Sequence, residues 1–117
     1  MRDKDELARS GEAAAAQYLV SSGLTILARN WQCPTGELDI VARAGRTLVV
    51  CEVKTRTTTK YGHPAEAVTL SKLTRLRRLA ATWLAHHGGG YDQIRIDILA
   101  LTSTPTGFTI DHIPGVG

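Results

Sequence analysis

Two carboxylates and one amine stand in two neighbouring apolar segments of the sequence. Asp39 lies within the segment 38–42, and Glu52 and Lys54 lie at the end of the segment 48–54. Burying a charged side chain costs several kcal/mol unless the charge is paired or binds a metal ion. Because the chain accepts this cost in both segments, we predict that Asp39, Glu52 and Lys54 are functional residues.

A hairpin is predicted to bring the two segments together. Residues 37–43 and 47–54 have the composition of strands, with a turn signal between them. A two-residue loop at Gly45–Arg46, with glycine first, fits the preferred hairpin turns. A loop at Ala44–Gly45 is the alternative and would shift the strand pairing by two residues.

The Gly45–Arg46 loop would set Asp39 opposite Glu52 and Glu37 opposite Lys54, with all four side chains on one face of the sheet. Opposed residues have Cβ atoms about 4.5–5.5 Å apart, so the two carboxylates would repel one another unless a cation lay between them. Carboxylate and water oxygens suit Mg²⁺ or Mn²⁺ best. The sequence therefore predicts a magnesium or manganese site on this face of the sheet.

An alternative is that these charges form ordinary ion pairs on a solvated sheet face. Against it, Val41, Leu48 and Val50 share the face in the same register. The acidic group would then lie at one end of a largely buried face, which favours a pocket.

The remaining elements must position this hairpin. Helices are predicted at residues 3–22 and from Pro64 to His87, the second either continuous or interrupted near Ser71. Residues 55–63 are predicted to form a loop. Further strands are predicted at residues 25–33, 93–101 and 108–113. The strand at residues 93–101 is predicted to be half-exposed on one face. The order α-β-β-β-α-β-β indicates an α/β fold with a central mixed sheet flanked by helices.

Bulk properties describe one globular domain over residues 1–117. Fourteen Lys and Arg against eleven Asp and Glu give a net charge of +3, which is compatible with a nucleic-acid partner. We find no signal peptide and no membrane-spanning run, and therefore expect a cytoplasmic protein. Cys33 and Cys51 lack metal-site spacing and are expected to be reduced thiols.

A basic group is predicted on the second helix, where it could hold the phosphates of DNA on either side of the acidic pocket. The alternative is a solvated helix face. The candidate phosphate ligands are Arg56 and Lys60 in the predicted loop and Lys72, Arg75 and Arg78 on the helix.

Asp39 followed by Glu52-Val53-Lys54 resembles the PD-(D/E)xK nuclease signature, although Leu38 stands where proline is common. Together with the segments 36–41, 62–68 and 95–97, these residues resemble the YraN-like family of bacterial proteins. That family is similar to archaeal Holliday junction resolvases. Arg95 and Asp97 belong to the family pattern, and we predict for them a cross-strand pair with a structural role.

The resemblance implies a restriction-endonuclease-like fold and a role for each matching residue. Asp39, Glu52 and the backbone carbonyl of Val53 would bind the metal, and Glu12 on the first helix would approach it. Lys54 would orient or help to deprotonate the attacking water.

The expected function is that of a Mg²⁺- or Mn²⁺-dependent DNA endonuclease. Branched or junction DNA is implied as substrate by the resemblance alone. A domain of this size covers one strand, so cutting a duplex suggests a homodimer. The alternatives are a non-catalytic nucleic-acid-binding module and an accessory protein of DNA repair or recombination.

Overall fold

The computed structural model describes residues 4–57 and 68–116. In chain order, its elements are α1 (Lys4–Ser21), β1 (Thr25–Cys33), β2 (Gly36–Ala44), β3 (Thr47–Arg56), α2 (Leu70–His87), β4 (Gln93–Thr104) and β5 (Gly107–Ile113). The predicted order of helices and strands is confirmed.

The strands form one mixed sheet in the order β1-β2-β3-β4-β5. The pair β3 and β4 is parallel, and the other neighbouring pairs are antiparallel. A parallel pair needs a crossover connection, and α2 lies within it. The fold is therefore α/β with a mixed sheet, as the sequence indicates.

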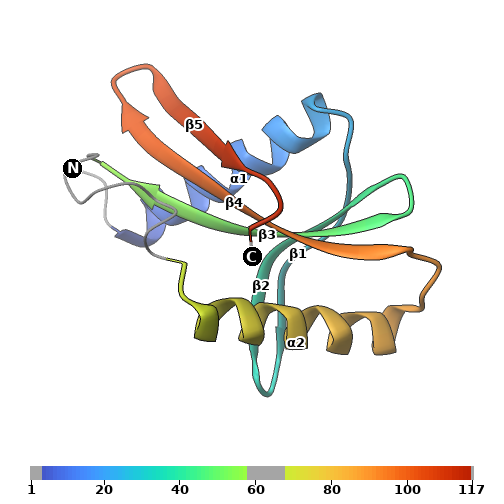
Figure 1. Ribbon diagram of the computed structural model, residues 1–117. Helices are drawn as coiled ribbons and strands as arrows, with labels where there is room; N and C mark the ends of the chain where they lie inside the picture. Colours follow the sequence, from blue (N-terminus) through green and yellow to red (C-terminus); the bar gives the residue numbers. More distant parts are fainter. Residues whose placement is uncertain (1–3, 58–67, 117) are drawn as a thin grey trace.

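The two helices cover opposite faces of the sheet (Figure 1). Two apolar cores result, one between α1 and the sheet and one between α2 and the sheet. The α1 core contains Ala15, Ala16 and Leu19 together with Ile40, Ala42, Val49, Cys51, Leu99 and Leu101. The α2 core contains Leu76, Leu79, Ala80 and Trp83 together with Leu38, Val41, Leu48, Val50 and Ile96.

Gly11 lets α1 approach the end of β3 closely. A Cβ atom at this position would lie 2.8 Å from the Cγ2 of Thr55 and closer still to its hydroxyl oxygen. Atoms do not pack at such distances, so any other residue here would force α1, β3 or the Thr55 side chain to shift. This contact brings the first three turns of α1 beside the strand that carries Glu52 and Lys54.

The hairpin of β2 and β3 has the predicted register at its turn. Ala44 pairs with Thr47, which confirms the loop at Gly45–Arg46, and Gly45 has a φ of 59°. Regular pairing then ends at Ile40 and Cys51. The predicted pairing of Asp39 with Glu52 and of Glu37 with Lys54 is therefore wrong.

A break in alternation within β2 is the physical reason. Leu38 and Val41 both contact the α2 core, although strict alternation would place residues three apart on opposite faces. The irregularity between them falls at Asp39. Opposite it on β1, Asn30 has a φ of 51° and no pairing partner in the ladder.

Several predicted boundaries need correction, among them the end of β4, which lies at Thr104 rather than at residue 101. The second helix begins at Leu70, with Thr69 as its N-cap, and runs without a break past Ser71. The predicted start at Pro64 lies outside the described residues, but Val68 and Thr69 are not helical. Strand β3 continues to Arg56, into the predicted loop, because its pairing with β4 extends that far.

Strand β4 lies between β3 and β5 and is buried from Ile96 to Leu101, so the prediction of a half-exposed strand is wrong. Asp97 is fully buried, and the pair that it forms with Arg95 lies within one strand rather than across two. Arg95 donates two hydrogen bonds of 2.9 Å to Asp97. His112 of β5, at 2.8 Å, supplies the cross-strand partner of the same carboxylate.

Cys33 and Cys51 are both free thiols, as predicted. None of the helices formed by the described residues is long and apolar enough to cross a membrane.

Candidate functional site

Asp39 lies where β2 separates from β3. Because the ladder ends at Cys51, the N–H of Val53 has no strand partner on this side, and it donates to Oδ2 of Asp39 at 2.9 Å. Val53 is the middle residue of the Glu52-Val53-Lys54 segment. The predicted register was expected to place Asp39 beside the Glu52-Val53-Lys54 segment. In the structure the irregular backbone brings Asp39 there instead.

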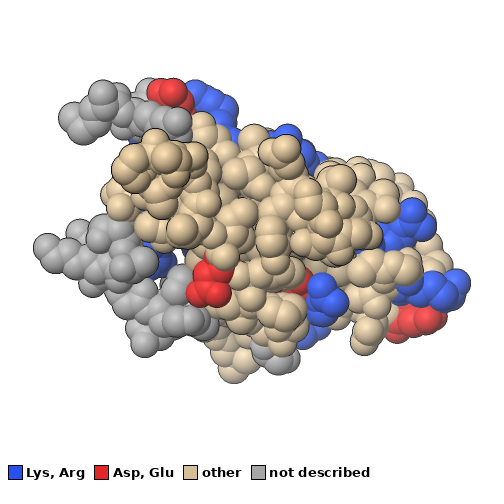
Figure 2. Space-filling view, turned by 90° about the horizontal axis from the view of Figure 1, so that it is seen from above, with Lys and Arg blue, Asp and Glu red and all other residues tan. Residues whose placement is uncertain are grey.

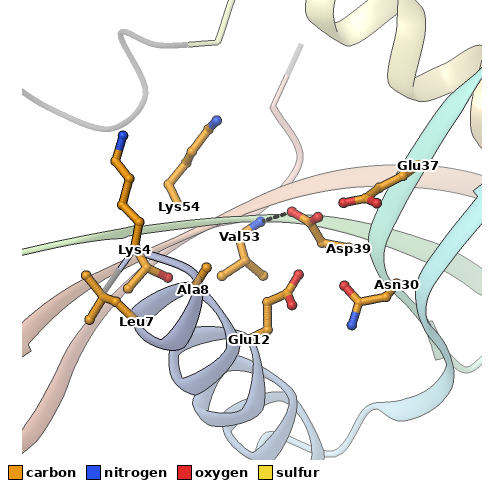
Figure 3. Close-up of a pocket in the computed structure, with 10 residues that line it drawn as sticks. Lys4, Leu7, Ala8, Glu12, Asn30, Glu37, Asp39, Val53 and Lys54 are labelled. Atoms are coloured by element: carbon orange, nitrogen blue, oxygen red, sulfur yellow. Dashed lines mark hydrogen bonds between the residues drawn. The ribbon is translucent and has the colours of Figure 1, made fainter. Parts of the chain in front are cut away.

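Asp39 faces a cavity of about 400 Å³ between the first turns of α1 and the ends of β2 and β3 (Figure 3). In Figure 3 the carboxylates of Glu12, Glu37 and Asp39 point toward one another. The side chains of Lys4 and Lys54 run side by side toward the opposite rim. The cavity therefore has an acidic side and a basic side.

The surroundings of Asp39 change its protonation. Burial, the largest cause, and the negative charges of Glu52, Glu12 and Glu37 together raise the pKa of Asp39 from 3.8 to about 6. The hydrogen bond from Val53 acts in the opposite direction and offsets only part of this rise. A cation placed among these groups would reverse the effect, because it favours the ionised carboxylates.

Glu12 forms the α1 wall of the acidic side. With the amide of Asn30 turned so that its nitrogen faces Glu12, the amide donates to both carboxylate oxygens at 3.0 and 3.1 Å. Burial raises the pKa of Glu12 despite this hydrogen bond. Asn30 is the only non-glycine residue with positive φ in the described chain, a conformation that asparagine tolerates better than most residues.

Glu52 lies outside the cavity lining, on the α2 side of β3. It follows Leu48 and Val50 at two-residue spacing, and both contact the α2 core. Lys72 of α2 reaches its Oε1 at 3.1 Å, and Lys54 lies 3.7 Å from the same oxygen. Since Lys54 also lines the cavity, it connects the Glu52 ion pair with the acidic side.

Lys54 carries its charge less readily than an ordinary lysine. The neighbouring amine of Lys72 and burial lower the pKa of Lys54, whereas Glu52 and Asp39 act in the opposite direction. A lysine of lowered pKa can accept a proton at neutral pH more often than an exposed one.

The described residues contain no group of three or more His, Cys, Asp and Glu side chains placed to hold a metal ion by themselves. The protein ligands available here are oxygen atoms: the carboxylates of Asp39, Glu12 and Glu37 line the cavity, and the charge of Glu52 acts on Asp39 from the α2 side of β3. Mg²⁺ is commonly bound through one or two carboxylates, with water and substrate phosphates completing its shell. The donor set fits such an open site and does not fit a closed protein cage.

The predicted phosphate ligands have different environments. Lys60 lies outside the described residues. Arg56 ends β3 beside the site, and Lys72 is mostly buried against Glu52. Arg75 and Arg78 are exposed on α2, where they line a shallow groove.

Charge is also unevenly spread over the surface. On the face seen from above, side chains other than Lys, Arg, Asp and Glu cover most of the centre, and Lys and Arg side chains lie around the edges, most of them at the right (Figure 2). This face is therefore not a uniformly basic surface.

Sequence reasoning missed Asn30, Lys4 and Thr55 as residues of the cavity wall. An asparagine within a predicted strand was the available signal for Asn30, because asparagine is depleted in strands and enriched at positive φ. No sequence signal indicates that Lys72, eighteen residues beyond Lys54, pairs with Glu52.

The model of the uncharacterised protein family UPF0102 matches residues 11–101. The chain belongs to this family. It is 52% identical to a UPF0102 protein of Beutenbergia cavernae over 118 residues, covering 100% of both chains. It is 50% identical to a UPF0102 protein of Frankia casuarinae over 116 residues, with 98% of each covered. The matched range of the UPF0102 model includes Glu12, Asp39, Glu52, Lys54 and Lys72.

Proposed function

We propose that this protein is a divalent-cation-dependent endonuclease that hydrolyses phosphodiester bonds in DNA. The observation that carries the proposal is the position of Asp39, whose carboxylate accepts the Val53 N–H in the middle of the Glu52-Val53-Lys54 segment. This contact unites the acid of one strand with the E-x-K of the next, the arrangement that the PD-(D/E)xK resemblance implies.

Asp39, Glu52 and the backbone carbonyl of Val53 would hold Mg²⁺ or Mn²⁺, and Glu12 would contribute from α1. When bound, the ion supplies positive charge that stabilises the negative charge developing on the phosphate. The raised pKa of Asp39 supports a cation here, because burial, the main cause, and three other carboxylates all disfavour the ionised form of this group. An isolated cluster of this kind is electrostatically unfavourable.

Lys54 would receive the proton of the attacking water. The water oxygen forms a bond to phosphorus as the ester P–O bond breaks, and the leaving oxygen takes a proton from solvent. The lowered pKa of Lys54 makes its amine an adequate acceptor, and its place in the cavity wall puts it within reach of a phosphate there. Lys4 on the same rim would hold a phosphate oxygen.

The test is a cleavage assay on plasmid, single-stranded, flap and four-way-junction DNA with Mg²⁺, Mn²⁺ or EDTA. Asp39→Asn, Glu52→Gln and Lys54→Met should each reduce cleavage at least about a hundredfold. Asp92→Asn is the matched control, since Asp92 is an exposed partner of Arg46 outside the cavity lining. Cleavage that survives all three substitutions would refute the proposal, and metal-independent DNA binding without cleavage would favour a binding module.

A further inference from the structure

Lys72 is fixed at the start of α2. Its backbone N–H donates to the side-chain oxygen of the N-cap Thr69 at 3.1 Å, so the first turn of the helix is held in place. The Lys72 side chain is only 17% exposed. This lysine is therefore directed inward, unlike Arg75 and Arg78 on the same helix.

The ammonium group of Lys72 lies 3.1 Å from Oε1 of Glu52, whose side chain is 14% exposed. For comparison, the pair formed by Arg46 and Asp92 has side chains that are 69% and 66% exposed. Exposed pairs contribute little, whereas breaking a largely buried pair leaves a charge without its partner. The contact with Lys72 is thus the stronger restraint on Glu52.

Lys54 approaches the same oxygen of Glu52, at 3.7 Å. A carboxylate in contact with two amines is already compensated without a metal ion. A divalent cation that binds Glu52 must therefore displace or share these amines, and it meets a positive charge at close range.

We propose that Lys72 is the counter-ion of Glu52 in the metal-free site and competes with the divalent cation for this carboxylate. The inference rests on the proposed function only in that the cation is taken to bind at Asp39 and Glu52. It assigns to Lys72 a positioning role in the site, in place of the phosphate contact predicted from the sequence.

The competition can be measured as Mn²⁺ binding, followed by the electron paramagnetic resonance signal of the free ion in the absence of DNA. Lys72→Met should bind Mn²⁺ about tenfold more tightly than the wild type, the lower end of the effect of one like charge at this range. Lys72→Arg keeps the positive charge and should remain near the wild type. Arg77→Met removes the same charge from an exposed position of α2 and should have no effect.

A second measurement separates competition from a loss of folding. In EDTA, Lys72→Met should melt at a lower temperature than the wild type, because Glu52 loses its nearest partner. Saturating Mn²⁺ should raise the melting temperature of Lys72→Met by more than that of the wild type, since the ion takes the place of the missing charge.

Equal or weaker Mn²⁺ binding by Lys72→Met, with binding by the wild type intact, would overturn this inference and leave the proposed function standing. A wild type that binds no Mn²⁺ would overturn both. Absence of DNA cleavage would count against the proposed function alone, because cation binding is measured without DNA.

Discussion

Asp39→Asn should stabilise the protein in the absence of metal while removing its response to metal. Asparagine has nearly the shape of aspartate, and its side-chain oxygen can still accept the hydrogen bond of Val53. The substitution therefore removes one negative charge from a buried acidic group and changes little else. A residue that makes the protein less stable than a similar neutral residue would is typical of a functional site.

The size of the effect follows from the pKa of Asp39. A rise from 3.8 to about 6 corresponds to about 3 kcal/mol of unfavourable free energy for the ionised side chain in the folded protein. Because Asp39 is only partly buried and salt screens its neighbours, we expect about half of this, about 1.5 kcal/mol. For a chain of this length, that corresponds to a rise of about 6 °C in Tm.

The sign of the pH dependence is fixed by the same shift. A carboxyl group whose pKa is higher in the folded state binds more protons when the protein is folded. The ionisation of Asp39 therefore lowers the free energy of unfolding as the pH rises from about 4 to about 6, and this loss of stability stays constant above pH 6. The advantage of Asp39→Asn over the wild type should therefore be full at pH 7.5. At pH 4.5 it should shrink to about one third.

Urea unfolding and thermal melts in EDTA at both pH values measure this difference, with Asp92→Asn as the control for loss of an exposed carboxylate. Mn²⁺ should then raise the Tm of the wild type and not that of Asp39→Asn. An Asp39→Asn variant that is less stable than the wild type in EDTA at pH 7.5 would refute the electrostatic reasoning.

Three further predictions concern the frame around the site. Gly11→Ala should lower the free energy of unfolding by about 2 kcal/mol, because the new Cβ meets the Thr55 side chain. Adding Thr55→Ala should restore part of this loss, as measured by urea titration. Equal stability of Gly11→Ala and the wild type would contradict the close approach of α1 to β3. Asp97→Asn should cost about 3 kcal/mol at pH 7, since it leaves Arg95 and His112 without their buried partner. Burial would raise the pKa of Asp97, but the hydrogen bonds from Arg95 and His112 outweigh burial and lower the pKa. The stability that Asp97 contributes is therefore complete above about pH 4 and lost on acidification. An Asp97→Asn variant with an unchanged acid-unfolding profile would contradict this role. A thiol reagent should modify only the half-buried Cys33 in the native protein and both cysteines in denaturant. The reason is that Cys51 is fully buried and its pKa is raised to about 12. Modification of both cysteines in the native protein would show that the α1 core opens.

The parts of the fold that follow local rules were predictable from the sequence. The Gly45–Arg46 turn sets the hairpin register, and the sequence order of helices and strands gives the mixed sheet. Charges within apolar strands singled out Asp39, Glu52 and Lys54, and the structure brings Asp39 to the segment that contains the other two.

The rest depends on contacts between distant parts of the chain. The irregularity at Asn30 and Asp39 interrupts the ladders of β2 on both sides, and a rule of strict alternation cannot foresee it. The pairing of Lys72 with Glu52 depends on where α2 begins, which its Thr69 cap determines. The burial of Asp97 depends on Arg95 and on His112, which belongs to another strand.

The most direct test of the cation site is the anomalous difference map of crystals grown or soaked with Mn²⁺. We predict one peak bounded by Asp39, Glu52 and the backbone carbonyl of Val53, and loss of this peak in Glu52→Gln. A saturating soak that leaves this position without a peak would contradict the account.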